Sequence, residues 1–218
     1  MSQIALPLDT AITAQDDHYI VTLSNAGAHD QLQNWQDWPN LTAILIGDHA
    51  AGKSVMAQQF ERDSGGYVVD DAAVMQDDDL FHLWNRARQE QKPLLLVSSK
   101  PVPAWGVDLP DLKSRLAASL LIEIGPPDEA MIAGLFQKYF GSRGLSISED
   151  ALSYLGKRME RSYRDVQLLS QSMDKLAIER KRPITRAIAK EALERHQMSG
   201  DEPETVSQAA QNDEKLNG

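Results

Sequence analysis

A glycine-bounded loop constrains the fold of this chain more than any other feature. The loop covers residues 47–54 and reads Gly-Asp-His-Ala-Ala-Gly-Lys-Ser. An apolar run at residues 41–46 precedes it, and a segment with helical character at residues 55–61 follows it. A strand, a loop with this glycine and lysine spacing, and a helix form the pattern of a phosphate-binding loop. The sequence therefore predicts an α/β unit built around a nucleotide's phosphates.

Each residue type in this loop has a physical role in binding an anion. Gly47 and Gly52 let the backbone turn sharply, so that several N–H groups can approach phosphate oxygens. The helix that begins at Lys53 directs the positive end of its dipole at the same anion. Lys53 would contact the terminal phosphates, and the Ser54 hydroxyl would bind Mg²⁺. The candidate nucleotide-binding residues of the loop are Gly47, Asp48, His49, Ala50, Ala51, Gly52, Lys53 and Ser54.

Composition narrows the class of protein. The 218 residues are 42% hydrophobic, which is enough for a buried core, and the net charge of −10 argues against general electrostatic binding of nucleic acid. There is no cysteine, so disulfide and thiolate chemistry are excluded. The sequence has no apolar run long enough to span a membrane and no secretory signal pattern at its start. We expect a cytoplasmic protein that does not bind membranes.

Two further apolar runs end in polar residues that could complete the site. Residues 67–69 are followed by Asp70 and Asp71, and carboxylates at the end of a buried strand are suited to Mg²⁺. Asp70 is the candidate metal ligand, and Asp71 occupies the place of a catalytic base that activates water. The run at residues 94–99 ends in Ser98 and Ser99. These hydroxyls are either sensors beside the phosphates or simply the polar end of a strand.

The order of the segments predicts a layered architecture. Apolar runs alternate with helical segments up to Pro126 and Pro127, which favours a parallel sheet covered by helices. From Asp128 the apolar spacing is helical only. Asp77, Asp78 and Asp79 are interpreted as capping the start of a helix, where acidic side chains suit the dipole, and not as metal ligands. We expect an α/β nucleotide-binding core at 16–126, a helical domain at 127–198 and a disordered tail at 199–218.

Two segments upstream of the loop each allow two interpretations. Residues 1–15 are apolar at first but show neither helical nor strand periodicity. They either fold back on the body or form a linear docking peptide, with Leu6 and Leu8 entering a partner's pocket. Nearer the loop, Trp35 and Trp38 either help to form the floor of a base pocket or pack on the first helix.

Together these motifs resemble the AAA+ ATPases, and within them the relatives of the replication initiator DnaA, over about residues 2–196. The loop resembles Walker A, residues 67–71 resemble Walker B, and residues 94–99 resemble the sensor-1 strand. Residues 109–116 are similar to a family segment in which an arginine finger sits at the place of Arg115, and Arg164 occupies the sensor-2 position of a helical lid. The start of the chain is similar to a clamp-binding peptide, through Gln3, Ile4, Leu6, Pro7 and Leu8.

The resemblance also shows what this chain lacks. Only sixteen residues separate Lys53 from Asp70, where a standard AAA+ core has a further strand and helix. We therefore expect a reduced parallel sheet of four or five strands, no initiator-type grip on single-stranded DNA and no sequence-specific DNA binding. Ser98 and Ser99 stand where a stronger polar side chain is common, which implies weak or no intrinsic hydrolysis.

The resemblance implies a regulator of replication initiation. Such a protein would bind ADP or ATP with Mg²⁺, dock on the sliding clamp of DNA polymerase III and present Arg115 to ATP-bound DnaA. Homo-oligomers are a further expectation, because AAA+ proteins usually act in assemblies. The alternatives are an autonomous AAA+ ATPase such as a helicase loader, or a subunit that resembles those of clamp loaders.

Overall fold

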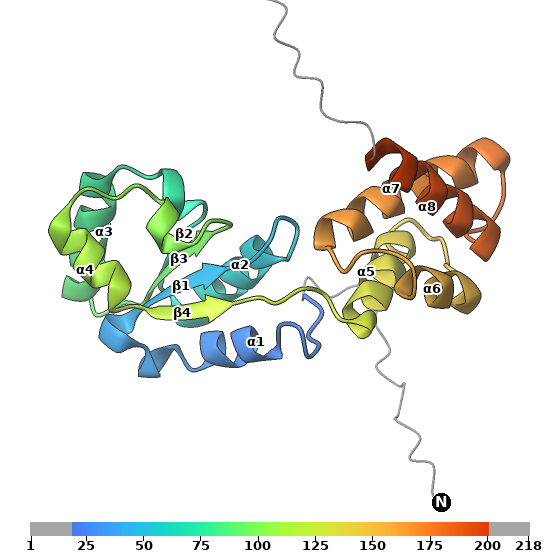
Figure 1. The fold of residues 1–218 in the computed structure, drawn as a ribbon. Coiled ribbons are helices and arrows are strands. Elements are labelled where there is room, and N and C mark those ends of the chain that lie inside the picture. The colour runs from blue at the N-terminus through green and yellow to red at the C-terminus, as the bar shows by residue number, and fades with distance from the viewer. Residues whose placement is uncertain (1–18, 201–218) are drawn as a thin grey trace, which may run out of the picture.

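A four-stranded parallel sheet forms the centre of the larger part of the molecule. The computed structural model describes residues 19–200, and the side chains of residues 19–198. The strands are β1 (Thr42–Ile46), β2 (Tyr67–Val69), β3 (Leu94–Ser98) and β4 (Leu120–Glu123), in the spatial order β2-β3-β1-β4 (Figure 1). β1 lies between β3 and β4, with Ile46 opposite Ser98 and Glu123. The sheet therefore has the reduced number of strands that the short Lys53-to-Asp70 spacing predicts.

Helices cover both faces of the sheet. The α/β part contains α1 (Ala26–Gln33), α2 (Lys53–Ser64), α3 (Asp77–Gln89) and α4 (Pro110–Ala117), with short 3₁₀ turns between them. α1 and α2 pack on one face against Leu45 and Val97, whereas α3 and α4 pack on the other against Ile44 and Leu96. Residues 94–97 of β3 are fully buried, as expected for a central parallel strand covered on both faces.

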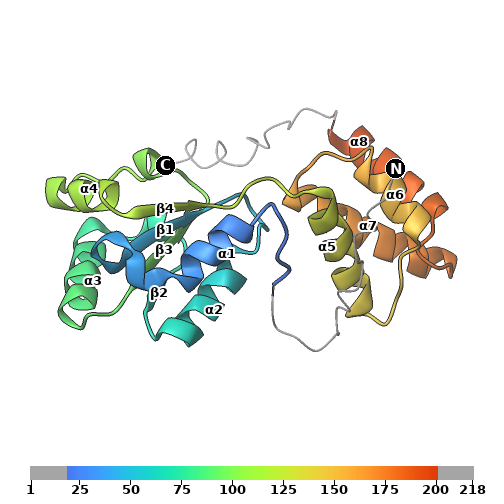
Figure 2. The same cartoon turned by 90° about the horizontal axis from the view of Figure 1, so that it is seen from below.

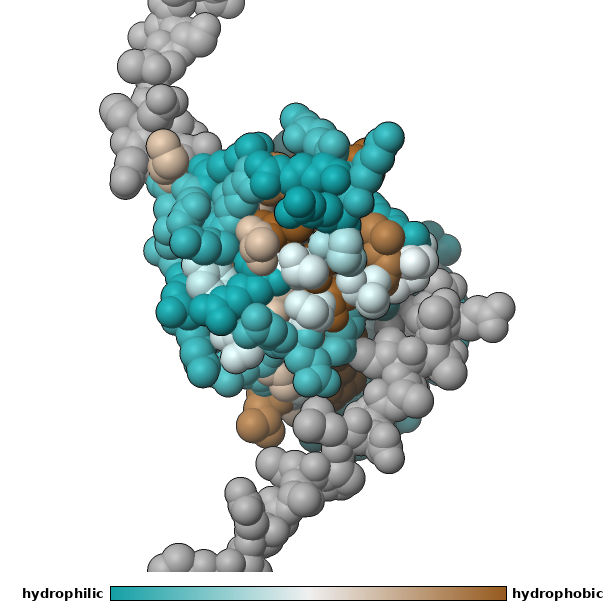
Figure 3. Space-filling model, turned by 90° about the vertical axis from the view of Figure 1, so that its right-hand side faces the viewer, coloured by the Kyte–Doolittle hydropathy of each residue, from teal (hydrophilic) through white to brown (hydrophobic). Residues whose placement is uncertain are grey.

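Four helices without a strand form the second part. They are α5 (Glu129–Gly141), α6 (Glu149–Gly156), α7 (Tyr163–Arg180) and α8 (Arg186–Gly200). Their apolar faces enclose a separate core that includes Phe136, Phe140 and Leu169. Figures 1 and 2 show this bundle beside the sheet, beyond the end of β4. The face that it presents in Figure 3 is mostly hydrophilic, with small separate hydrophobic patches.

Asp128 joins the two parts. Its carboxylate accepts hydrogen bonds from the N–H of Met131 at 2.7 Å, as the N-cap of α5, and from the N–H of Ser24 at 2.9 Å. Burial alone would raise the pKa of Asp128, but the hydrogen bonds from Met131, Thr22 and Ser24 outweigh it and lower the pKa. The ionised carboxylate therefore ties the segment before α1 to the start of the helical bundle.

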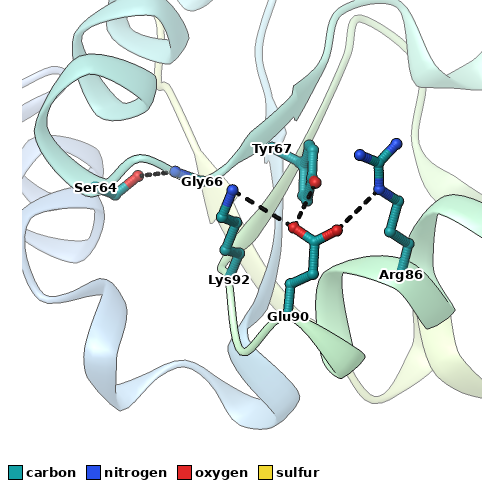
Figure 4. Close-up of polar contacts among 6 residues, drawn as sticks. All are labelled: Ser64, Gly66, Tyr67, Arg86, Glu90 and Lys92. Atoms are coloured by element: carbon teal, nitrogen blue, oxygen red, sulfur yellow. Dashed lines mark hydrogen bonds and ion pairs between the residues drawn. The ribbon is translucent and has the colours of Figure 1, made fainter.

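A charged cluster surrounds Tyr67, at the start of β2. In the described residues β2 pairs only with β3, so one edge of this short strand carries no neighbouring strand. Glu90 accepts a hydrogen bond from the Tyr67 hydroxyl at 2.7 Å and lies between Arg86 and Lys92 (Figure 4). The pKa of Glu90 is lowered to about 2, mainly by the hydrogen bond from Tyr67 and next by the hydrogen bond from Arg86. Short edge strands flanked by charges resist unwanted strand pairing.

The prediction that the acidic run caps α3 is wrong, because Gln76 is the N-cap and no side chain makes a capping hydrogen bond there. Asp77, Asp78 and Asp79 do occupy the first turn of α3. The Asp77 carboxylate, however, accepts the N–H groups of Asp108 at 2.7 Å and Leu109 at 2.9 Å. It therefore holds the segment that leads into α4, in addition to lying at a favourable end of its own helix.

None of the helices in the described part of the chain is both long and apolar enough to cross a bilayer.

Candidate functional site

A cavity of about 570 Å³ opens at the carboxyl ends of three neighbouring strands. Parallel strands bring their carboxyl ends to one edge of the sheet, where ligands bind in open α/β folds. The cavity therefore collects residues from the glycine-bounded loop, from the end of β2 and from the end of β3. Its lining is Asp48, His49, Ala50, Ala51, Gly52, Lys53, Ser54, Val55, Asp70, Asp71, Val74, Ser98, Ser99 and Lys100.

Lys53 is the first residue of α2 and is 9% exposed. Its ammonium donates hydrogen bonds to the carbonyl oxygens of Gly47 at 2.8 Å and Asp48 at 2.7 Å. Desolvation lowers the pKa of Lys53, while the nearby carboxylates of Asp70, Asp48 and Asp71 oppose this shift. A buried cation whose present partners are neutral carbonyls is well placed to exchange them for phosphate oxygens.

The loop backbone follows the conformation that the glycine pattern predicts, with one exception. Gly52 has φ +82°, a value that favours glycine. A Cβ at Gly47 would lie 3.1 Å from the Ile124 Cβ, so this position allows little beyond a hydrogen atom. Ala50 has φ +64°, which strains a residue that carries a Cβ. The loop thus stores some strain at the wall of the cavity.

Ser54 and Asp70 lie together at the cavity wall. The Ser54 hydroxyl donates a hydrogen bond of 2.6 Å to the Asp70 carboxylate, which joins α2 to the residue that follows β2. Asp71 has φ +54°, is exposed, and donates its N–H to the Asp70 carboxylate at 3.0 Å. A hydroxyl beside a carboxylate fits a Mg²⁺ ion that takes its other ligands from phosphates and water. No group of three or more histidine or acidic side chains suited to a metal occurs in residues 19–198.

Ser98 and Ser99 both reach the cavity, but in different environments. Ser98 is 1% exposed, and its hydroxyl oxygen accepts the N–H of Lys100 at 2.9 Å, which shapes the turn after β3. Ser99 is partly exposed. The placement is compatible with both interpretations of the sequence, because Ser98 stabilises a strand end and also lines the cavity.

A second, smaller cavity of about 50 Å³ lies between the sheet and the helical bundle. It shares Ala50, Ala51 and Gly52 with the large cavity. The Tyr163 hydroxyl lies 3.4 Å from the Ser24 hydroxyl, and burial raises the pKa of Tyr163. The other residues of the lining come from both parts of the molecule: Tyr19, Ile20, Asn25, Met56, Met131, Leu135 and Tyr163.

The sequence did not identify most residues of this smaller cavity. Trp38 does not line it: its indole N–H donates to the Gln31 carbonyl oxygen of α1 at 2.8 Å, so it packs on the first helix, and its ring also stacks on Phe60 of α2 with centroids 5.0 Å apart. Tyr19 and Ile20 lie in the segment that precedes α1. Met131 and Tyr163 carry no local signal, because only the position of the bundle brings them to the loop.

Arg115 lies outside both cavities, on α4. Its guanidinium stacks on the rings of Phe81 and Trp84, at 4.1 Å from each ring centroid, and donates a hydrogen bond of 2.8 Å to the Asn85 side chain. All three partners belong to α3. The side chain is half-buried. A guanidinium that stacks on two aromatic rings has a more fixed orientation than one that is surrounded by water.

Arg164 lies in the first turn of α7 and is exposed. It lines neither cavity, so the structure does not bring it to the other predicted site residues. Its neighbour Tyr163 is the α7 residue that does reach the loop. The predicted docking residues Gln3, Ile4, Leu6, Pro7 and Leu8 lie outside the described residues.

The fold is that of the AAA+ ATPases, with a P-loop α/β core followed by a helical lid. Domain III of the replication initiator DnaA from Thermotoga maritima superposes with a TM-score of 0.66, at 14% identity, over 81% of this chain and 94% of that one. DnaA from Aquifex aeolicus bound to AMPPCP gives a TM-score of 0.53, at 15% identity, over 68% of this chain and 60% of that one. No protein-family model matches the chain.

Sequence comparison relates the chain to DnaA itself. DnaA of Thermomicrobium roseum is 30% identical over 117 residues, which is 53% of this chain and 25% of that protein. DnaA of Cutibacterium acnes is 23% identical over 132 residues, which is 58% of this chain and 26% of that protein. The matches thus cover about a quarter of the length of these relatives. The chain is a low-identity relative of the DnaA replication initiators.

Proposed function

We propose that this chain is a nucleotide-binding regulator that acts on a DnaA-type replication initiator, in the manner of the DnaA-related regulator Hda. The observation that carries the proposal is a contrast within one chain. Lys53, Ser54 and Asp70 gather in a cavity that suits a bound nucleotide. Arg115 is held against α3 and lines neither cavity, so it would not reach a nucleotide bound by its own chain.

The large cavity would hold the phosphates of an adenine nucleotide, ADP or ATP. Lys53 would exchange its two carbonyl partners for phosphate oxygens, and the loop N–H groups with the start of α2 would complete the anion site. Ser54 and Asp70 would hold Mg²⁺, which neutralises phosphate charge when bound. DnaA from Aquifex aeolicus binds AMPPCP, an adenine nucleotide analogue, and this supports the choice of ligand.

The position of Arg115 supports action on a neighbouring molecule. An arginine finger stabilises the charge that develops on the transferred phosphoryl group, and it is commonly supplied by a partner. The aromatic stacking against α3 would limit the entropy lost when Arg115 meets the partner's phosphate. Hydrolysis would then take place in the initiator, and Asp71 would have at most a minor role as a base.

Docking on a sliding clamp completes the proposal. Residues 3–8 would bind the clamp through Leu6 and Leu8, which would bring the regulator to clamp-loaded DNA. The four-stranded sheet leaves no described unit between α2 and β2 that resembles a single-strand-binding insertion. The regulator would therefore depend on the clamp, and not on its own grip, to reach DNA.

The direct test measures hydrolysis of ATP prebound to DnaA, with this protein and clamp-loaded DNA present together or singly. Hydrolysis should accelerate only when both are present. Leu6→Ala with Leu8→Ala should abolish this dependence on the clamp and weaken binding to the isolated clamp. Unchanged hydrolysis in the complete mixture would reject the regulatory function.

An autonomous ATPase is the competing function, since Asp71 lies at the cavity beside Asp70. The same mixtures distinguish the two functions. An autonomous enzyme would hydrolyse free ATP without DnaA, and that rate would fall in Asp71→Asn. The regulator would show little hydrolysis of its own.

A further inference from the structure

Lys100 is placed at the large cavity by the order of the strands. It follows β3, which lies between β1 and β2. Ser98 is opposite Ile46, so the chain after β3 leaves the sheet beside the start of the loop at Gly47. On its other side β3 neighbours β2, which leads into Asp70. Lys100 therefore leaves the sheet between the phosphate-binding loop and the candidate metal ligand.

The backbone of Lys100 is fixed on both sides. Its N–H donates to the Ser98 hydroxyl at 2.9 Å, and its carbonyl oxygen accepts the indole N–H of Trp105 at 2.9 Å. Ser98 and Trp105 are buried, with 1% and 9% exposure. Two buried side chains thus hold the turn, whereas the Lys100 side chain itself is exposed at the cavity. This arrangement presents a lysine from a rigid position.

The ammonium of Lys100 is available for a ligand. In the part of the chain that the structure describes, it makes no ion pair or hydrogen bond, whereas the Lys53 ammonium already has two carbonyl partners. The cavity also contains Asp48, Asp70 and Asp71, so an anionic ligand meets several negative charges there. A second cation is needed to offset them, and Lys100 is the other lysine in the lining.

The positions of the two cavities define the orientation that a bound nucleotide would take. The smaller one, at about 50 Å³, does not enclose a base, but its lining includes Tyr19 and Tyr163, aromatic side chains on which a base would stack. Ala50–Gly52 lie in both cavities, so phosphates would extend from that shared wall into the large cavity. Lys100 lines the large cavity and not the small one. It is therefore positioned for the phosphate farthest from the base.

We propose that Lys100 binds the terminal phosphate of a nucleoside triphosphate and makes this chain favour the triphosphate over the diphosphate. The inference rests on the proposed binding of nucleotide by the Lys53 loop. Lys100 would then recognise the terminal phosphate, a role that Ser98 and Ser99 would otherwise have to fill. Ser98 contributes indirectly, because its hydroxyl positions the Lys100 backbone.

The test measures dissociation constants of ATP and of ADP, each with Mg²⁺, for the full chain by titration calorimetry. Lys100→Ala should weaken ATP about tenfold, the size expected for one charge-assisted hydrogen bond, and should change ADP much less. Lys100→Arg should keep most of the preference for ATP. Lys113→Ala is the matched control, because Lys113 is an exposed lysine on α4 that lines neither cavity.

The outcomes separate this inference from the proposed function. The role of Lys100 would be overturned if Lys100→Ala changed the affinities for ATP and ADP equally, or changed neither. The proposed nucleotide site would still stand in that case, provided that Lys53→Ala abolished binding. Failure of the unmodified chain to bind either nucleotide would overturn both proposals. Near-ultraviolet circular dichroism checks that the Trp105 environment is retained in each variant.

Discussion

Lys53 and Arg115 are the two cations on which the proposed function depends, and the chain holds them in different ways. Lys53 is buried in the loop, with backbone carbonyls as its partners. Arg115 is half-buried on a helix surface, with two aromatic faces and one amide as its partners. Carbonyls can be given up for phosphates within the same cavity. Aromatic stacking leaves several guanidinium donors free while it fixes the direction of the group.

Under the proposed function, the two cations would act in different places. Lys53 lies where the chain's own ligand would bind, together with Ser54 and Asp70. Arg115 lines neither cavity, and under the proposed function its charge would act on a molecule that approaches from outside. Substitutions at Lys53 and at Arg115 should therefore affect different measurements. Variants at each position test whether nucleotide binding and action on a partner are separate.

The largest effect is expected for Arg115→Ala. Removal of an arginine finger costs on the order of 10³-fold in rate or more, so stimulated hydrolysis by DnaA should fall by about that factor. The measurement is single-turnover hydrolysis of DnaA-bound ATP with clamp-loaded DNA. The variant's own affinity for ADP should stay within about twofold of the original.

Arg115→Lys serves as the comparison variant, because lysine keeps the charge but loses the planar guanidinium that stacks and binds in a fork. We expect only partial recovery of the stimulated rate. Stimulation by Arg115→Ala equal to that of the unmodified chain would show that another group acts on the partner.

Lys53→Ala should affect nucleotide binding first. Loss of a buried cation that makes two hydrogen bonds should weaken ADP about 100-fold, measured by titration calorimetry with Mg²⁺. Any loss of stimulated hydrolysis should be recovered in part at high nucleotide concentration, because Arg115 is intact. Normal affinity in this variant would show that the glycine-bounded loop does not bind nucleotide.

Asp128→Asn tests the joint beside the smaller cavity. The pKa of Asp128 is lowered in the folded protein, so its carboxylate contributes stability above the ordinary pKa of about 4, and this contribution is lost as the pH falls through the lowered value. We expect the variant to unfold about 0.5–1 kcal/mol more easily at pH 7, because asparagine can still cap α5 but lacks the negative charge that interacts with the helix dipole. Urea unfolding at pH 7 and pH 3 measures this, and the difference should shrink at the lower pH. A difference that is the same at both values would contradict the role of the charge.

The smallest effect is expected at the exposed cluster beside β2. Arg86 lies over the Tyr67 ring as Arg115 lies over its two rings, but the Arg86 side chain is 65% exposed. Tyr67→Phe removes the first cause of the low pKa of Glu90, so that pKa should rise from about 2 toward its ordinary value. A carbon-detected NMR titration measures the change. Hydrolysis and nucleotide affinity should not respond, and a clear response would give this edge a function.

The sequence predicts the parts of the site that are local in the chain. Glycine spacing at residues 47 and 52, with Lys53 and Ser54 at a helix start, specifies the loop without knowledge of the rest. The short distance from Lys53 to Asp70 predicts the missing strand and helix, and the four-stranded sheet agrees. Strand order then brings Asp70 and Ser98 to the loop, because parallel strands end at a common edge.

The remaining features depend on packing between distant segments. Trp84 is buried on α3, but the sequence does not show that Arg115 stacks on it from α4. Tyr163 reaches the smaller cavity only because of where the helical bundle lies, whereas the neighbouring Arg164 is exposed. Periodicity identifies a buried face of a helix but not its partner.

The hydrogen bond between Ser24 and Asp128 has a consequence for how the chain matures during its synthesis. Its two ends are 104 residues apart, and the contact of Ser24 with Tyr163 spans 139. At about 5–20 residues per second, the ribosome delivers Asp128 roughly 5–20 s after Ser24. β1, β2 and β3, whose carboxyl ends line the large cavity, are delivered by residue 98, which is 30 residues before Asp128. All residues that line the large cavity are therefore synthesised before Asp128, whereas the smaller cavity must wait for Met131 and Tyr163.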